Sequence, residues 1–176
     1  AEPFGEAFLR RAIGHLLVGD LPGVRAAYVA TVAALRKREL STYDVSSRVR
    51  LTKTPERYLA IRGELRELTY EALLASGRTS WTPGERVRVY KTAAGHGGVV
   101  SEAEDGARLA GVPDNRDYDV DHYVAVLRDN FAERLSRALR PEHFAAIVSD
   151  PEQPSLFDES LREATTILTQ SGGNAA

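Results

Sequence analysis

Two apolar stripes at helical spacing near the amino end constrain the fold more than any other feature of this sequence. Their members are Phe8, Leu9, Ala12, Ile13, Leu16 and Leu17, followed by Val24, Ala27, Tyr28, Thr31, Val32 and Leu35. Apolar residues that recur every three or four positions predict amphipathic helices, here over residues 4–18 and about 22–38. Gly19-Asp20 interrupts the pattern, and Pro22 stands where a first helical turn tolerates proline. The short break predicts an antiparallel helical hairpin.

Two later segments repeat the helical pattern. The first covers about residues 64–75 and ends before Gly77, a residue that suits the left-handed position after a helix. It is expected to bury Leu65, Leu68, Ala72 and Leu73. The second covers about residues 120–139, with an apolar face made of Val120, Tyr123, Val124, Leu127, Phe131, Leu135 and Leu139. A further turn is expected to begin at Pro141.

Short stretches of alternating character predict a small strand element. Residues 86–91 alternate polar and apolar side chains, residues 45–51 do so in part, and Val99-Val100 is a candidate partner strand. Thr54 precedes Pro55 and is suited to cap a turn or short helix. Together these patterns predict a mainly helical α+β fold, in which a helical hairpin and long helices accompany a small strand element and a flexible carboxy-terminal tail.

Length and composition suit one domain of a cytoplasmic protein. The chain has 176 residues, of which 43% are hydrophobic and 27% are charged, which is enough for one core and hardly for two. No apolar run approaches the ~20 residues that cross a bilayer, and no signal segment opens the chain. The absence of cysteine excludes disulfides and fits a reducing compartment. We therefore expect no membrane contact, a domain over residues 1–149 and a tail over residues 150–176.

Basic residues are concentrated in one part of a chain whose formal net charge is −2. Between positions 36 and 67 there are nine basic and five acidic residues, whereas the balance becomes acidic from Glu102 onward. A basic zone on a nearly neutral chain is typical of a module that contacts nucleic acid along one edge. The alternative is an ordinary solvated charged surface.

Other polar clusters are better explained without catalysis. Asp119 and Asp121 could suggest paired metal-binding carboxylates, but they stand at the start of a helical pattern, where carboxylates cap the helix and favour its dipole. The glycine-rich residues 95–98 lack the Gly-Lys-Ser/Thr of a phosphate loop. The four histidines have no metal-ligand spacing. We expect no catalytic residue, no metal and no cofactor in this chain.

Three segments in this order resemble the thumb of family B DNA polymerases. They are Arg48-Val49-Arg50-Leu51-Thr52-Lys53 with Tyr58 and the helix before Gly77, then Thr82-Pro83-Gly84-Glu85 with the following strand, and finally Asp117-Tyr118-Asp119-Val120-Asp121-His122-Tyr123 at the start of a long helix. The order and spacing of these motifs make the match more specific than any one of them. The resemblance covers about residues 1–148 and implies the carboxy-terminal thumb of a bacterial enzyme of the DNA polymerase II type.

The resemblance implies that this region grips a primer–template duplex through its phosphates. Such a grip needs cations and donors and reads no base sequence. Arg48 and Arg50 lie two apart on an extended segment and should project to the same side. The residues implied to contact DNA are Arg50, Thr52, Lys53 and Tyr58, with Arg48 and Arg57 as further candidates. For each of them the alternative is an exposed cation or hydroxyl without a partner.

The same resemblance places the chemistry outside this chain. The parent polypeptide would be a DNA-directed DNA polymerase with upstream palm and exonuclease domains. Its catalytic aspartates and Mg²⁺ would belong to that palm, so whether this chain is part of an enzyme depends on what accompanies it.

A pentapeptide in the tail predicts a protein partner. Gln153-Pro154-Ser155-Leu156-Phe157 matches the motif with which bacterial proteins bind the sliding clamp. In this motif the amide of Gln153 bonds the rim of a pocket, Ser155 takes the position of a small or acidic residue, and the adjacent apolar anchors Leu156 and Phe157 fill the pocket. The alternative is that both anchors pack back on the preceding domain. We thus expect a polymerase thumb tethered to the clamp, or else a stand-alone helical adaptor that binds the clamp and has no polymerase attached.

Overall fold

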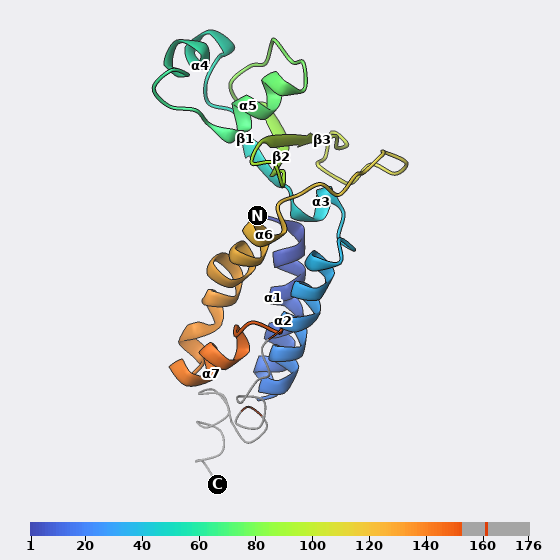
Figure 1. Cartoon of the computed structure of the whole chain (residues 1–176), viewed down its shortest axis with the longest axis vertical. Coiled ribbons are helices and arrows are strands. Elements are labelled where there is room, and N and C mark those ends of the chain that lie inside the picture. Colours follow the sequence, from blue (N-terminus) through green and yellow to red (C-terminus); the bar gives the residue numbers. More distant parts are fainter. Residues whose placement is uncertain (153–160, 162–176) are drawn as a thin grey trace. The chain divides into compact units, whose positions relative to one another are not determined.

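The computed structural model describes residues 1–152 and residue 161, and within them the chain forms two compact units (Figure 1). The sheet unit consists of residues 1–3 and 40–122, and the helical unit consists of residues 4–39 together with the described residues from 123 onward. The predicted α+β class is confirmed, because helices predominate and a three-stranded antiparallel sheet accompanies them. The sequence patterns predict one domain over residues 1–149, and both units contribute to that range.

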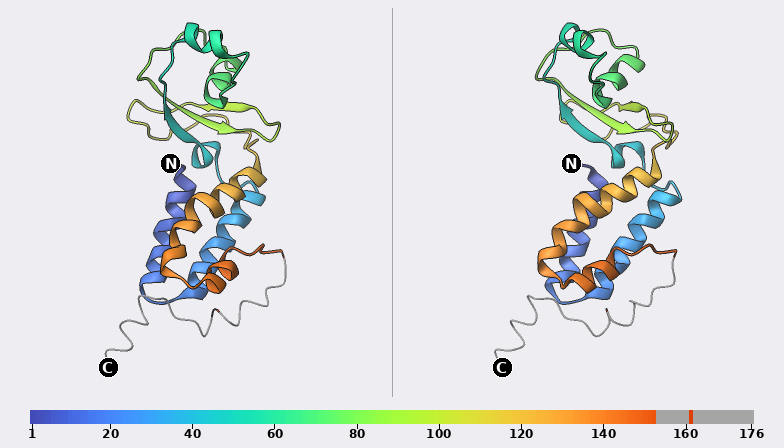
Figure 2. Two further views of the ribbon diagram at one scale, coloured as in Figure 1. Left: turned by 90° about the vertical axis from the view of Figure 1, so that its left-hand side faces the viewer. Right: turned by 60° about the vertical axis from the view of Figure 1, so that its left-hand side comes forward.

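The predicted helical hairpin is confirmed in the helical unit. α1 (Pro3–Leu17) and α2 (Leu21–Arg36) run antiparallel and side by side, as Figures 1 and 2 show. Gly19 has φ +75°, which lets the chain reverse between them. Asp20 caps α2, because its carboxylate accepts a hydrogen bond of 2.9 Å from the amide of Gly23. The stripe predicted for α2 is buried, as are Phe8, Ala12 and Leu16 of the stripe predicted for α1. Ile13 and Leu17, predicted for the same stripe, are instead 42% and 63% exposed.

The segment predicted as one long helix over residues 120–139 instead consists of three consecutive helical segments of different type. It begins as α6 (Val120–Val126), continues as the π-helix η1 (Leu127–Phe131) and then tightens into the 3₁₀-helix η2 (Ala132–Ala138). The apolar positions Tyr123, Leu127, Phe131 and Leu135 are spaced by four, so an α-helix with 3.6 residues per turn would rotate them away from the core. A wider π turn counteracts this drift, and all four are buried.

The helical unit closes with α7 (Pro141–Ile147), which is tied to α2 by a buried cation. The side chain of Arg25 is only 7% exposed, and its Nη1 donates to the carbonyl oxygens of Ile147 at 2.8 Å and Ser149 at 2.6 Å. Carbonyl groups at a helix end lack intrahelical donors, so Arg25 satisfies groups that burial would otherwise penalise. Among residues 1–152 and 161, no helix has both the length and the apolar character needed to span a bilayer.

The sheet unit combines three strands with three short helices. Its elements are α3 (Thr42–Val45), β1 (Ser47–Arg50), α4 (Pro55–Ile61), α5 (Leu68–Ala75), β2 (Arg86–Lys91) and β3 (Gly97–Val100). β2 lies in the centre and pairs antiparallel with β1 and with β3, as predicted for residues 86–91 and 99–100. Thr54 caps α4 by accepting from the amide of Arg57 at 3.2 Å, which confirms its predicted role.

The core of the sheet unit lies between the sheet and α5, which covers one face of the strands (Figure 2). Val87 and Val89 of β2 point into it. The rings of Tyr58 and Tyr70 stack with centroids 4.7 Å apart, and Trp81 packs beside Tyr70. Because these side chains fill the α5 face, the residues that alternate with Val87 and Val89 must point to the opposite face of the sheet.

α5 is shorter than predicted, and two of its four predicted core residues are exposed. Glu67 is extended, with φ −113° and ψ 129°, so the helix begins at Leu68 rather than near position 64. Leu65 consequently lies outside the helix and is 57% exposed, and Leu68 at the first helical position is 40% exposed. Ala72 and Leu73 are buried as predicted. The predicted role of Gly77 is confirmed: its φ is +89°, and its amide donates to the carbonyl of Leu74 in a helix-ending turn.

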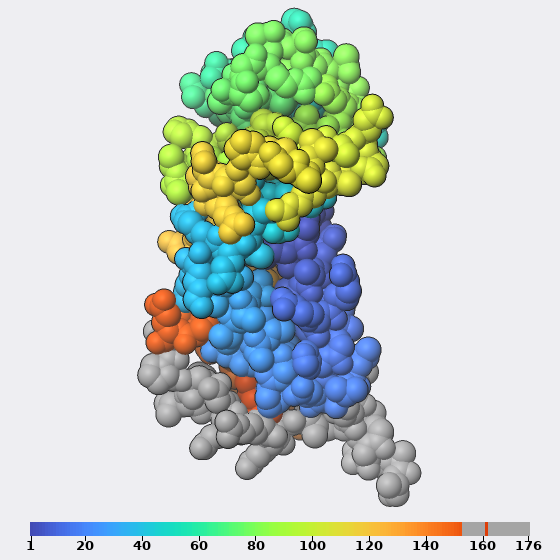
Figure 3. Space-filling view, turned by 90° about the vertical axis from the view of Figure 1, so that its right-hand side faces the viewer, coloured from blue at the N-terminus to red at the C-terminus, as the bar shows by residue number. Residues whose placement is uncertain are grey.

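The segment after β3 crosses the surface of the sheet unit and leads into α6 (Figure 3). Within it Glu102 pairs with Arg108 in an isolated bridge. At its end the carboxylate of Asp119 accepts from the amide of His122 at 3.1 Å, which confirms that this aspartate caps α6. Asp121 is exposed on the first turn of that helix.

Candidate nucleic-acid interface

Four arginines lie on the face of the sheet that α5 does not cover. The register of β1 and β2 places Arg48 opposite Arg88 and Arg50 opposite Arg86. Residues that face each other across antiparallel strands share a side of the sheet, and residues two apart on a strand do so as well. All four therefore belong to one surface, which we call the arginine face. It confirms the expectation that Arg48 and Arg50 project together.

The inner pair of the arginine face is held by one carboxylate. Oε1 of Glu102 lies 3.0 Å from Nε of Arg48, and Oε2 lies 2.8 Å from Nε of Arg88. Arg88 is only 8% exposed, and its guanidinium stacks on the ring of Tyr43 at 4.1 Å from the centroid. It also donates to Oγ of Ser46 at 3.2 Å. Arg88 thus has a structural role, and the shared carboxylate of Glu102 holds Arg48 beside it.

The outer pair has no such neutralising group among residues 1–152 and 161. Arg50 and Arg86 are exposed, and within the described part of the chain neither side chain forms a hydrogen bond or ion pair. The acidic neighbour of Arg86 in sequence is Glu85, but its carboxylate binds Arg78 at 2.7 and 3.1 Å. The hydrogen bond from Arg78 lowers the pKa of Glu85, so the carboxylate stays ionised and paired with Arg78. Two like charges directly opposite each other destabilise a strand pair.

A tight turn fixes the position of the outer pair. The carbonyl of Thr82 accepts from the amide of Glu85 at 3.1 Å, and Gly84 between them has φ +96°. A proline followed by a glycine with positive φ is typical of a type II turn. The amide of Gly84 donates to the carbonyl of Leu51 at 2.7 Å, and the amide of Leu51 donates to the carbonyl of Glu85 at 2.8 Å. These bonds hold the ends of β1 and β2 together, and with them Arg50 and Arg86.

The arrangement is suited to bind an anion with several oxygen atoms. Among the described residues, the ion pairs of these four guanidinium groups are with Glu102 alone, so the charges in contact leave an excess of positive charge. A guanidinium offers its donors in a planar fork that matches phosphate and carboxylate groups. An anion that bridges Arg50 and Arg86 would relieve their mutual repulsion. This surface can therefore bind phosphates without any contact to bases.

Thr52 and Lys53, predicted to contact DNA, occupy the turn after β1. Thr52 is exposed, and its backbone amide donates to the hydroxyl of Tyr70 at 3.0 Å. The ammonium of Lys53 forms an ion pair of 2.7 Å with Glu67 and lies 5.5 Å from the centroid of the Tyr70 ring. Thr52 can therefore meet a ligand as it stands, whereas Lys53 would first have to leave Glu67.

Arg57 and Tyr58, the other predicted contacts, differ in exposure. Arg57 is exposed on α4. Tyr58 is fully buried; its hydroxyl donates to Glu71 at 2.6 Å and accepts from the amide of Glu67 at 3.1 Å. Burial, followed by the hydrogen bond to Glu71, raises the pKa of this phenol. In this conformation Tyr58 orders the loop between α4 and α5 and has no hydroxyl donor to offer a phosphate.

Sequence reasoning missed Arg86 and Arg88 as partners of the predicted site. Their alternation with valine was recognised as a half-buried strand, but the strand with which β2 pairs was not known. The signal that could have found them is the matching pattern in the two segments, since Arg48-Val49-Arg50 and Arg86-Val87-Arg88 have the same alternation. Pairing the two valine sets in one core places the two arginine sets on one face.

The predicted clamp-binding residues Gln153, Ser155, Leu156 and Phe157 lie outside the described residues. The last part of the chain before them is fixed to α2, because Arg36 forms an ion pair of 3.2 Å with Asp150. Comparison of the chain with protein-family models, curated proteins and solved structures finds no match.

Proposed function

We propose that the arginine face binds the phosphate backbone of double-stranded DNA. The observation that carries the proposal is the outer pair: Arg50 and Arg86 are exposed, face each other across two strands and lack a carboxylate partner within the described residues. The repulsion between two like charges in this position destabilises the strand pair, and a bound polyanion would relieve that repulsion, which favours binding. Arg48 lies on the same face. Thr52, exposed in the turn after β1, and Arg57, exposed on α4, are further candidates for phosphate contact.

The sequence motifs suggest the setting of this activity. In the proposal the chain acts as the thumb of a bacterial family B DNA polymerase, holding the primer–template duplex behind a palm that carries the catalytic aspartates and Mg²⁺. A thumb must follow any sequence, and phosphate contacts provide affinity that does not depend on the bases. The setting would be cytoplasmic, where both DNA and the replication machinery of bacteria are found.

The test of DNA binding uses the purified chain and two fluorescent duplexes of unrelated sequence. Anisotropy titrations at 50 mM salt should give the same dissociation constant for both duplexes within about twofold, because phosphates are common to every sequence. The affinity should fall linearly with the logarithm of salt concentration. Strong preference for one sequence, or no binding at low salt, would contradict the proposal.

We also propose that residues 153–157 tether the chain to a sliding clamp. The tether would raise the effective concentration of the chain at the primer end without any new contact to DNA. Capture on an immobilised bacterial clamp should be abolished by Leu156→Ala combined with Phe157→Ala. Equal capture of the wild type and this variant would refute the clamp assignment.

The stand-alone clamp adaptor is the competing function, and the two experiments together separate it from the thumb. An adaptor would require the pentapeptide but would not require Arg50 and Arg86 for its binding. Clamp capture without duplex binding would therefore favour the adaptor. Duplex binding that depends on Arg50 and Arg86 would favour the thumb.

A further inference from the structure

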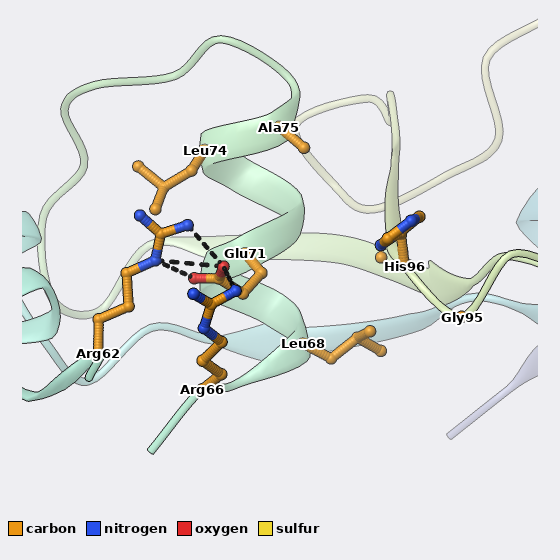
Figure 4. A pocket seen from close by; sticks show the side chains of 9 residues that line it. Arg62, Arg66, Leu68, Glu71, Leu74, Ala75, Gly95 and His96 are labelled. Atoms are coloured by element: carbon orange, nitrogen blue, oxygen red, sulfur yellow. Dashed lines mark hydrogen bonds and ion pairs between the residues drawn. The ribbon is translucent and has the colours of Figure 1, made fainter. Parts of the chain in front are cut away.

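A pocket of about 650 Å³ opens beside α5, and it is lined by none of the residues of the arginine face. Arg62 and Arg66 form its charged side together with Glu71, and Leu68 and Leu74 of α5 supply apolar wall (Figure 4). Figure 4 shows His96, on the loop before β3, at the other side of the opening. Pockets of 300–1,000 Å³ with a few placed polar groups commonly bind small molecules.

The charged side of the pocket is built around the carboxylate of Glu71, which accepts hydrogen bonds from two side chains. Nε and Nη2 of Arg62 lie 2.9 and 2.8 Å from the two oxygens of Glu71, and the hydroxyl of Tyr58 donates to the same carboxylate at 2.6 Å. The hydrogen bonds from Arg62, and then from Tyr58, lower the pKa of Glu71. Glu71 therefore remains ionised and holds the guanidinium of Arg62 in place.

Arg66 differs from Arg62 because its side chain forms no hydrogen bond with any of the described residues. Its Nη1 lies 3.8 Å from Glu71, which is too far for a hydrogen bond, and its side chain is 71% exposed. Two guanidinium groups thus face one carboxylate, which leaves a single excess positive charge. A singly charged anion would neutralise this excess, whereas a doubly charged phosphate would add repulsion from Glu71.

The apolar wall specifies the other half of the ligand. Leu68 is 40% exposed and lines the pocket beside Leu74 and Ala75. Close packing limits how far this wall can move, because a Cβ at Gly97 would lie 2.8 Å from the carbonyl oxygen of Leu68 and 2.7 Å from Cβ of Ala72. A ligand that covered Leu68 would remove its apolar surface from water, which is favourable.

From these observations we infer that the pocket binds a carboxylate carried on a short apolar body. The carboxylate takes the donor fork of Arg66, since a planar fork matches a carboxylate with two parallel hydrogen bonds. The apolar body lies against Leu68 and Leu74. A free carboxylic acid and the carboxy-terminal residue of a peptide ending in an apolar side chain both present this chemistry.

The test is a titration of ¹⁵N-labelled protein with hexanoate, hexanamide, inorganic phosphate and the dipeptide N-acetyl-alanyl-leucine. Hexanoate should shift the amide signals of residues 66–75 and 95–97, whereas hexanamide and phosphate should not. Arg66→Gln should weaken hexanoate binding about tenfold or more, since a hydrogen bond between charged groups is lost. Arg57→Gln, a matched exposed arginine on α4, should leave the binding unchanged.

Equal shifts with hexanoate and hexanamide, preference for phosphate, or unchanged binding by the Arg66→Gln variant would overturn the proposal. Binding of the dipeptide in competition with hexanoate would support it and identify a peptide terminus as a source of the ligand. The Arg50→Gln/Arg86→Gln variant should bind hexanoate as the wild type does, so the fate of this proposal is independent of that of the arginine face.

Discussion

Replacement of Arg50 and Arg86 by glutamine should change the salt dependence of DNA binding by a calculable amount. Each phosphate that a cation neutralises adds about 0.9 to the slope of log affinity against log salt concentration. The two side chains have no carboxylate partner within the described residues, so both charges are available to phosphates. The double variant should therefore lose about 1.8 from the slope, which is about 12-fold in relative affinity between 50 and 200 mM salt.

The same substitutions should not harm the fold. Arg50 and Arg86 face each other across β1 and β2, and removal of these two like charges should stabilise the strand pair by about 0.2–1 kcal/mol. A thermal unfolding curve checks this sign. A variant that is at least as stable as the wild type and yet binds DNA with a smaller slope has lost a binding function, since loss of structure would reduce both quantities.

Fluorescence anisotropy with a labelled duplex at five salt concentrations measures the slope. The matched control is Arg10→Gln with Arg137→Gln, which removes two exposed arginines from the helical unit. If the control reduces the slope as much as the test variant, net charge explains the binding and the specific role of the arginine face is refuted. A slope that the Arg50→Gln/Arg86→Gln variant leaves unchanged refutes it equally.

Three further substitutions test the framework of the sheet unit. Glu102→Gln should lower the free energy of unfolding by about 3 kcal/mol in a denaturant titration, because it leaves the buried Arg88 without a charge partner; a loss under 1 kcal/mol would contradict that role. The lowered pKa of Glu71 implies a stabilising contribution that is present above its usual value of 4.5 and is lost as the pH falls through the folded-state value. Glu71→Gln should therefore flatten the decline of stability below about pH 5, and an unchanged decline would contradict the linkage. Gly97→Ala should destabilise by about 1–3 kcal/mol, because its Cβ would press on the backbone of Leu68, whereas Gly14→Ala, where a Cβ meets open space, should not.

Apolar periodicity was sufficient to predict those helices and strands whose ends are also marked by break or capping residues. The first two helices were located because the apolar stripe and the break at Gly19 and Asp20 give the same boundary. Residues 86–91 form β2 as predicted, since two-residue alternation is specific to a half-buried strand. Thr54 and Asp119 were recognised as caps because capping depends on residue type and position alone.

Features that depend on distant residues could not be predicted in the same way. The helix at α5 begins late because Glu67 is held extended: its amide bonds to the hydroxyl of Tyr58 and its carboxylate to Lys53. The π turn ends at Phe131, whose ring centroid lies 6.0 Å from that of Phe4. Neither contact is visible in a local sequence window.

The candidate site was predicted in part for the same reason. Alternation alone placed Arg48 and Arg50 on one side of an extended segment. The pairing of that segment with β2, which added Arg86 and Arg88, required a register that local patterns do not contain. Burial of Tyr58 likewise depends on α5, whose Glu71 accepts its hydroxyl.

The claim that the outer pair of the arginine face meets DNA can be measured directly by NMR of the arginine Nε–Hε groups. On addition of a short duplex at low salt, the signals of Arg50 and Arg86 should shift most, that of Arg48 less, and that of the buried Arg88 least. Shifts confined to arginines of the helical unit, or signals of Arg50 and Arg86 that stay in place while the protein binds the duplex, would contradict the account.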